Sequence, residues 1–396
     1  MAAVQAQEEV QPIVLLFNAL NTCDKKSRLK EVARLFLKLG FTAFGGPAVH
    51  IAMMRNEVVD KLKWFDDQYF LDMVGATNLV PGPTSTELAI LISQKRAGWK
   101  GLLIGGLCFI MPAVIITGII AWLYKLYGSV PTIQPFVYGI KPAIIVVILG
   151  AIYPLAKRSL KSVELGIIGI ATLALCILGY NQLYIMFGAG FIALAIAALK
   201  NRNTTASFLP LVLLQAPAQS IISLTNTRLF FSFLKIGCIL YGSGYVLFAF
   251  LDSEFVQQGF LQRQQLIDAI VVGQFTPGPV FSSVTFVGYQ MNGLQGAVLG
   301  TIAIFLPAFV FVGLLSTAIL KLRESTLFAS FLDAVNMASV AIILSVCYQL
   351  GKDNIADWRT ITIAIVCFIV VFTFKKLNSA WVILGGALLG YILYLV

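Results

Sequence analysis

Charged side chains are scarce in this sequence: they make up 12% of its 396 residues, whereas hydrophobic residues make up 59%. Histidine occurs once, as His50, and five of the six cysteines are scattered through apolar segments. An ordinary soluble enzyme carries more charge, a metal centre needs several ligands, and a disulfide framework needs clustered cysteines. The sequence therefore predicts a membrane protein with no metal and no cofactor, in which the cysteines are packing residues.

Enzyme signatures are missing as well. The sequence has no Gly-rich nucleotide loop followed by Lys-Ser/Thr, no paired carboxylates in a polar setting and no Cys/His cluster, so we predict no catalytic residue and no enzyme activity. The net charge of +10 could indicate nucleic acid binding. Basic residues in short loops between apolar segments usually set membrane orientation instead, so we expect no nucleic acid partner.

Apolar segments of about 20 residues recur from the first third of the chain to its end, and each can cross a hydrocarbon core of roughly 30 Å. We expect an all-α integral membrane protein, embedded in the lipid bilayer as a multi-pass protein of the plasma membrane. The first residues show neither a basic leader nor a cleavage site, which favours a cytoplasmic N-terminus over a signal peptide.

A repeated unit accounts for most of the chain. Phe36–Gly40 returns as Phe233–Gly237, Pro81-Gly82-Pro83 returns as Pro277-Gly278-Pro279, and the offset between the copies stays between 195 and 197 residues. The predicted organisation is an N-terminal cytoplasmic arm at 1–32, a first transmembrane repeat at 33–207, a linking hydrophobic segment at 208–227 and a second transmembrane repeat at 228–396.

The relation between the two repeats depends on the apolar segment from Phe208 to Ile222. If this segment crosses the membrane, the second repeat starts on the opposite side and the repeats are inverted. A crossing leaves more of the lysines and arginines in cytoplasmic loops than the alternative does. We therefore predict two inverted-topology repeats with about thirteen transmembrane segments, some of them broken or re-entrant.

The Pro-Gly-Pro motifs lie within hydrophobic segments, where two prolines remove backbone donors and interrupt a helix. Broken backbone at membrane depth is tolerated only inside protein or beside a water-filled cavity. A helix start follows each motif, at Thr84 and near Phe281, and the free N–H groups and positive dipole of a helix start suit an anion. A packing kink is the simpler interpretation, but recurrence in both halves favours a transport site.

Lysines recur within the predicted spans. Lys38 and Lys235 each come a turn or two before a second pair of breaks, at Phe44-Gly45-Gly46-Pro47 and Tyr241-Gly242-Ser243-Gly244. A lysine in a span should face a cavity, a partner carboxylate or the bundle interior, unless its long stem reaches the headgroups. Both interpretations remain open for this pair, whereas Lys141 is nearer the middle of its span.

Two further residues are candidates for handling protons. Glu87 lies one turn beyond the first Pro-Gly-Pro motif, with Ser283 as its counterpart. In a low dielectric Glu87 would carry a proton, unless a lysine holds it ionised, and both alternatives stay open. For His50, core or interface packing is the simpler interpretation and a proton relay is the alternative.

These motifs together resemble the chromate ion transporter family, in its long form with two fused homologous domains. The resemblance covers about residues 30 to 396. It implies a carrier that exports chromate, linked to the proton motive force, with sulfate as the close analogue. The family's characteristic positions correspond here to Lys38, Gly45, Gly46, Pro47, His50, Glu57, Asn78, Pro81, Gly82, Pro83, Glu87, Gly98 and Gly101.

We therefore expect a secondary transporter for a tetrahedral oxyanion, with a sulfate uptake carrier, an uncoupled anion channel and a membrane-embedded enzyme as alternatives. The oligomeric state is open, with a homodimer as one option. Glu87, with Glu57 or His50 behind it, is the proton-coupling candidate. The expected substrate-binding residues are Lys38, Lys235, Lys141, Gly45, Gly46, Asn78, Pro81, Gly82, Pro83, Thr84, Ser85, Gln274, Pro277, Gly278, Pro279 and Ser282.

Overall fold

The computed structural model describes residues 17, 20–127, 134–200, 225–241, 244–315, 326–374, 377 and 379–395. All regular secondary structure in these ranges is helical. Five helices are long and apolar enough to cross a membrane, and three shorter apolar helices accompany them. The protein is therefore an all-helical, multi-pass membrane protein, as predicted. The count of about thirteen segments stays a prediction, and the expected crossing from Phe208 to Ile222 lies outside the described residues.

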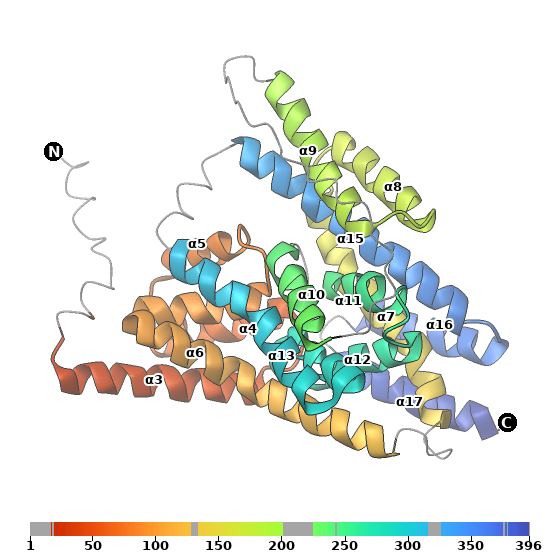
Figure 1. Ribbon diagram of the computed structural model, residues 1–396, viewed down its shortest axis with the longest axis horizontal. Helices are drawn as coiled ribbons and strands as arrows, with labels where there is room; N and C mark the ends of the chain where they lie inside the picture. Colours follow the sequence, from red (N-terminus) through yellow and green to blue (C-terminus); the bar gives the residue numbers. More distant parts are fainter. Residues whose placement is uncertain are drawn as a thin grey trace.

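Helices of the second repeat follow the order of the first (Figure 1). The first repeat contains α3 (Thr22–Thr42), α4 (Pro47–Arg55), a π-helical turn η1 (Asn56–Lys61), α5 (Asp67–Thr77), α6 (Thr84–Tyr127), α7 (Gln134–Ser159), α8 (Val163–Ile177) and α9 (Gln182–Lys200). The second contains α10 (Asn226–Ile239), α11 (Val246–Leu251), η3 (Asp252–Val256), α12 (Arg263–Phe275), η4 (Val280–Ser282), α13 (Ser283–Leu315), α15 (Thr326–Asn354), α16 (Trp358–Thr373) and α17 (Ser379–Leu395).

The repeat extends to backbone detail. Helix α6 consists of two arms that reverse direction at Ala97 and Gly98, and α13 reverses at the equivalent Asn292 and Gly293, so that Thr285 and Thr301 on the two arms of α13 are hydrogen-bonded at 2.7 Å. Both glycines have a left-handed backbone, with φ of 61° and 56°, which glycine adopts without a steric penalty. The same reversal at the same place in both halves is thus encoded by the same residue type.

Helices α6 and α13 run antiparallel. A Cβ atom on Gly313 would lie 2.7 Å from the Trp99 ring, and one on Gly118 would lie 3.9 Å from the Thr285 methyl group. Trp99 begins the second arm of α6 and Gly313 lies near the end of the second arm of α13, whereas Gly118 lies late in its arm and Thr285 is hydrogen-bonded to Thr301, early in the other. These second arms of α6 and α13 therefore run antiparallel, consistent with Figure 1. Because both helices are membrane-span candidates, the two repeats have opposite topology, as the charge distribution predicted.

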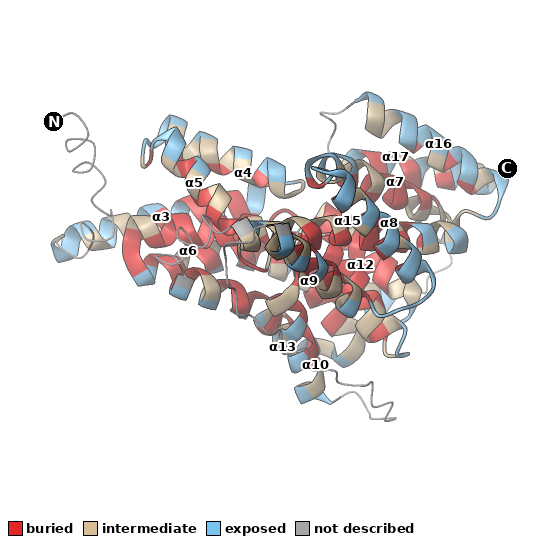
Figure 2. Cartoon of the chain, turned by 90° about the horizontal axis from the view of Figure 1, so that it is seen from above, coloured by how far each residue is buried: buried red, intermediate tan, exposed pale blue. Residues whose placement is uncertain are grey.

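The outer faces of α6 and α13 carry matching apolar stripes, with an exposed residue every fourth position. Such stripes have no place on a soluble surface and face lipid. The residues are Leu103, Leu107, Met111, Ile115 and Ile119 on α6 and their equivalents Val298, Ile302, Leu306, Val310 and Leu314 on α13. Buried residues gather instead in the interior, on helices such as α7, α12 and α15 (Figure 2).

The halves interlock through their later helices. Helix α7 packs against α16 and α17 of the second repeat, and α15 packs against α8 and α9 of the first. Glycines allow the closest approach, since a Cβ on Gly390 of α17 would lie 2.3 Å from the Cα of Gly139 on α7. Small residues at such crossings are typical of membrane helix pairs. The later helices of each repeat therefore pack mainly against helices of the other repeat.

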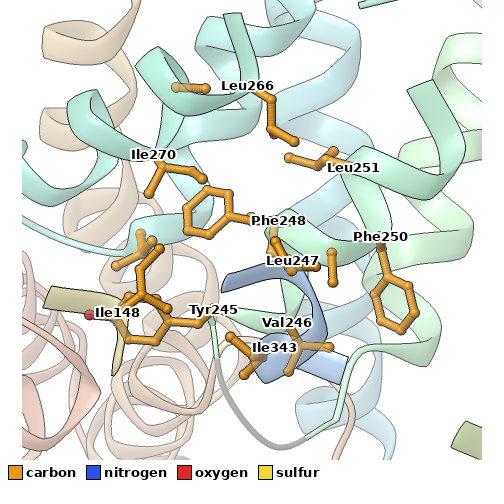
Figure 3. Packing of buried hydrophobic residues seen from close by; sticks show 14 of the residues in the cluster. Ile148, Tyr245, Val246, Leu247, Phe248, Phe250, Leu251, Leu266, Ile270 and Ile343 are labelled. Carbon is orange, nitrogen blue, oxygen red and sulfur yellow. The ribbon is translucent and has the colours of Figure 1, made fainter. Parts of the chain in front are cut away.

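The short helices α4 and α11 break this symmetry. All six residues of α11 are buried, and the helix packs against α15. Figure 3 shows its side chains among residues of α12, α7 and α15, including Ile148 and Ile343. Helix α4 is more open: Val49 is 44% exposed, whereas its repeat equivalent Val246 is 0% exposed. The same element is thus covered in one repeat and uncovered in the other.

Candidate functional site

Both Pro-Gly-Pro motifs interrupt helices, as predicted. Helix α5 ends at Thr77 and α6 begins at Thr84, whereas α12 ends at Phe275 and α13 begins at Ser283. The central glycines have φ of +141° at Gly82 and +92° at Gly278, in a region that residues with a side chain rarely adopt. The turns therefore depend on glycine as well as on proline.

Each Pro-Gly-Pro loop is bonded to the other repeat. The Gly82 N–H donates to the Leu240 carbonyl at 2.8 Å, and the Gly278 N–H donates to the Ala43 carbonyl at 2.8 Å. Ala43 and Leu240 are repeat equivalents that end α3 and α10. The contact is reciprocal, like that of a two-fold dimer interface, and it satisfies broken backbone inside the protein. The loops therefore lie where the two repeats meet.

Glu87 lies in the first turn of α6 beside this junction. Its side chain is fully buried, and neither carboxylate oxygen has a hydrogen-bond partner. A Cβ atom on Gly82 would lie 2.5 Å from Oε1, so the carboxyl group lies against the loop itself. Tyr241, at the break of the other repeat, is close enough to interact with its charge. An unpaired buried carboxylate costs several kcal/mol when ionised, so a neutral Glu87 suits this arrangement.

Gly82→Ala tests this packing. The new methyl group would need a positive φ and would overlap Glu87, so we expect transport to fall steeply and unfolding stability to drop by about 1–3 kcal/mol. Gly385→Ala is the matched control, because Gly385 lies inside α17 without a positive φ and nothing lies within 4 Å of its added Cβ. Thermal unfolding in detergent and vesicle flux measure both effects, and equal behaviour of the two variants would contradict the assignment.

His50 joins three parts of the junction. Its Nε2 lies 3.1 Å from the Ala43 carbonyl, which fixes the proton on that nitrogen, and its Nδ1 lies 3.2 Å from the Ser85 hydroxyl. The Ala43 carbonyl also accepts from Gly278 of the second repeat. The imidazole is buried and packs against the Phe109 ring in a T-shaped arrangement. Both nitrogens thus bond to neutral groups that set the positions of the two loops.

The second repeat replaces this polar group by apolar residues and adds hydroxyls elsewhere. The equivalents of His50 and Ser85 are Leu247 and Phe281, both buried. Thr117 of α6 instead contacts the hydroxyls of Thr276 and Ser282, both at 3.4 Å. Sequence reasoning missed Thr117 and Thr276. The available signal was that their equivalents in the other repeat, Val312 and Val80, are apolar.

The paired lysines form equivalent ion pairs. Lys38 bonds Glu57 at 2.9 Å and Lys235 bonds Glu254 at 2.6 Å, and both lysine side chains are about half exposed. Glu57 also accepts from Lys61 at 2.7 Å. Hydrogen bonds from Lys61 and Lys38 hold the pKa of Glu57 below its ordinary value, although desolvation acts in the opposite direction. Glu57 is thus ionised and paired near neutral pH.

The other predicted residues have varied surroundings. Lys141 of α7 is close enough to Asp268 of α12 for their charges to interact. Gln274 is buried, accepts from the Tyr245 hydroxyl at 3.4 Å and has an unpaired Nε2. Asn78 is exposed at the end of α5. Gly45 has φ of +118°, Gly46 precedes α4, and Thr84 begins α6. The repeat equivalents of Gly45 and Gly46, which are Gly242 and Ser243, lie outside the described residues.

Antiparallel repeats whose broken helices meet at one junction define a membrane transporter of the inverted-repeat class. The model of the chromate transporter family matches residues 30–194 and again residues 227–391. The chain belongs to this family, whose substrates are oxyanions, and the two matches correspond to the two repeats.

Relatives support the same assignment. The chromate transport protein of Cupriavidus metallidurans is 27% identical over 376 residues, which are 92% of this chain and 93% of the relative. The probable chromate transport protein of Synechococcus elongatus is 28% identical over 378 residues, 92% of this chain and 96% of the relative. An uncharacterised transporter of Bacillus subtilis is 24% identical over 144 residues, 35% of this chain and 81% of the relative. No solved structure matches the chain.

Proposed function

We propose that this protein is a secondary active transporter that exports chromate from the cell, linked to the proton motive force. The observation that carries the proposal is the reciprocal bonding of the two Pro-Gly-Pro loops, because it brings two helix N-termini to one junction between inverted repeats. Its relatives named as chromate transport proteins support chromate as the oxyanion. We further propose the plasma membrane as its location, with a cytoplasmic N-terminus.

Glu87 is the proposed proton carrier. It is the buried carboxyl group at the junction without a hydrogen-bond partner, so it gains most by holding a proton when closed and by releasing one when water reaches it. Glu57 suits this role less well, since two lysines keep it ionised. We assign His50 to positioning the loops, and Lys38 and Lys235 to attracting the anion at equivalent places in the two repeats.

The charge of the cargo decides which part of the proton motive force drives export. Chromate carries two negative charges, so chromate with one proton crosses as a single negative charge. A membrane potential contributes about 2.3 kcal/mol per charge for every 100 mV. An interior-negative potential therefore favours export, whereas an inward proton gradient alone opposes it.

Vesicle flux tests the proposal. Purified protein is reconstituted with labelled chromate or sulfate inside, and efflux is followed under an imposed potential, an imposed pH gradient, or neither. We expect an interior-negative potential to accelerate chromate efflux, with a further dependence on the pH gradient. Preference for sulfate with inward accumulation would instead establish the sulfate carrier. Flux that ignores the pH gradient would contradict proton coupling and favour the uncoupled anion channel, and vesicles without protein provide the baseline.

A further inference from the structure

The two breaks carry different chemistry. The first-repeat break has Glu87, His50 and Ser85, which can hold or hand over a proton, whereas the second-repeat break has neutral hydroxyl and amide groups. Building on the transport proposed above, we propose that the oxyanion binds at the second-repeat break and the proton at the first. The two breaks would then divide the two cargoes between them.

The hydroxyl groups at the second break are only weakly hydrogen-bonded within the protein, so they can donate to an anion. Thr117 and Ser282 are fully buried, yet their contact of 3.4 Å is long for an O–H···O hydrogen bond, and so is the contact of Thr117 with Thr276. Thr276 already donates to the Val272 carbonyl at 2.6 Å. The protons of Thr117 and Ser282 therefore lack a strong acceptor nearby.

Two further donors flank this cluster. The Ser283 hydroxyl is fully buried without a hydrogen-bond partner, and the Gln274 Nε2 is unpaired in a side chain that is 4% exposed. Ser283 begins helix α13, whose positive dipole end favours negative charge. Its Cβ lies 3.1 Å from the position that a Cβ on Gly273 would take, and Gly273 is next to Gln274 in the chain. Neutral donors and a helix N-terminus suit an oxyanion, because every partner donates and none is an acid.

The first break is less suitable for the anion, although the Thr86 hydroxyl there is also buried without a hydrogen-bond partner, because it offers fewer donors and includes an acid. The equivalents of Thr117 and Thr276 are Val312 and Val80, which are buried and have no donors. The equivalent of Ser283 is Glu87, whose ionised form would repel a dianion. An anion at the second break would in turn favour the protonated form of Glu87 across the interface, which links the two cargoes.

The test uses exchange of labelled chromate or sulfate between equal concentrations on both sides of the vesicle, which needs no proton gradient. Thr117→Val and Ser283→Ala should each raise the half-saturation concentration about tenfold, as expected for losing a donor to a charged acceptor. Thr86→Val is the matched control, because Thr86 is the buried first-repeat equivalent of Ser282 and should change the value less than about twofold.

Ser282→Ala removes a donor of the same cluster by a smaller change than Thr117→Val, so it serves as a second variant if Thr117→Val fails to fold. Thermal unfolding of each variant in detergent identifies any that fail to fold. Exchange by folded Thr117→Val and Ser283→Ala with wild-type half-saturation would overturn the assignment. Equal or greater weakening by Thr86→Val would do so as well. No exchange by the wild type would overturn the proposed function itself, whereas normal wild-type exchange combined with either of the first two results would overturn only the division of cargoes.

Discussion

Replacing Glu87 with glutamine should abolish proton coupling and leave gradient-free anion exchange intact. Glutamine keeps the size and polarity of the side chain but cannot release or accept a proton. Because Glu87 is fully buried and neither of its oxygens is hydrogen-bonded, the uncharged replacement should not destabilise the closed junction. Flux under a pH gradient should fall to the rate measured without one, and exchange should stay within about twofold of wild type.

Two variants make this result specific. Glu87→Asp keeps an acid but shortens it, so partial coupling should survive. Glu57→Gln removes the acid that is held by Lys38 and Lys61, and it should leave the pH-gradient response in place. A Glu87→Gln protein that still responds to a pH gradient like the wild type would show that the proton travels elsewhere. Loss of response in Glu57→Gln alone would transfer the role to Glu57.

Cross-linking the uncovered short helix should arrest transport. In the structure α11 lies against α15, whereas the equivalent α4 leaves Val49 exposed. If the repeats exchange these packings during alternating access, Val49 approaches Ile148 in the opposite state, as Val246 shares a buried cluster with Ile343 in this one (Figure 3). A Val49→Cys, Ile148→Cys pair should therefore form a disulfide that stops flux until it is reduced.

The Val246→Cys, Ile343→Cys pair is the matched comparison and should trap the state described here. Both pairs are made after replacing the six native cysteines, all of which are free thiols. The two pairs should respond oppositely to substrate, since a ligand that shifts the equilibrium disfavours one packing as it favours the other. Full transport by a cross-linked protein, or no cross-link at Val49 and Ile148 under any condition, would contradict the exchange of packings.

Much of the fold was predictable because the same sequence motifs occur in both repeats. The Pro-Gly-Pro motifs locate the helix breaks through the missing donors and restricted backbone of proline, and the glycines at 98 and 293 mark the turns between the two arms of α6 and of α13. Charge counting gave the opposite topology of the repeats, which the antiparallel course of α6 and α13 confirmed. The crossing of the linking segment and the number of spans stay predictions.

Site residues were predictable only where burying the side chain in an apolar segment costs free energy whatever its neighbours are. Glu87 attracts attention because a lone carboxylate in an apolar segment is expensive wherever its partners lie. Thr117 does not, because a threonine fits an apolar helix well and its hydroxyl partners are more than 150 residues away in the chain. The pairing of Lys38 with Glu57 depends on the chain turning back through α4 and η1, which no local pattern specifies.

The most direct test of coupled transport is to drive protons with the anion. Coupling is reciprocal, so if a proton gradient affects chromate movement, a chromate gradient must move protons. Vesicles holding a pH-sensitive dye are given a chromate gradient with the membrane potential clamped at zero. We expect a pH change that follows chromate in direction, is present in the wild type and is absent in Glu87→Gln. Chromate flux through the wild type without any pH change would contradict it.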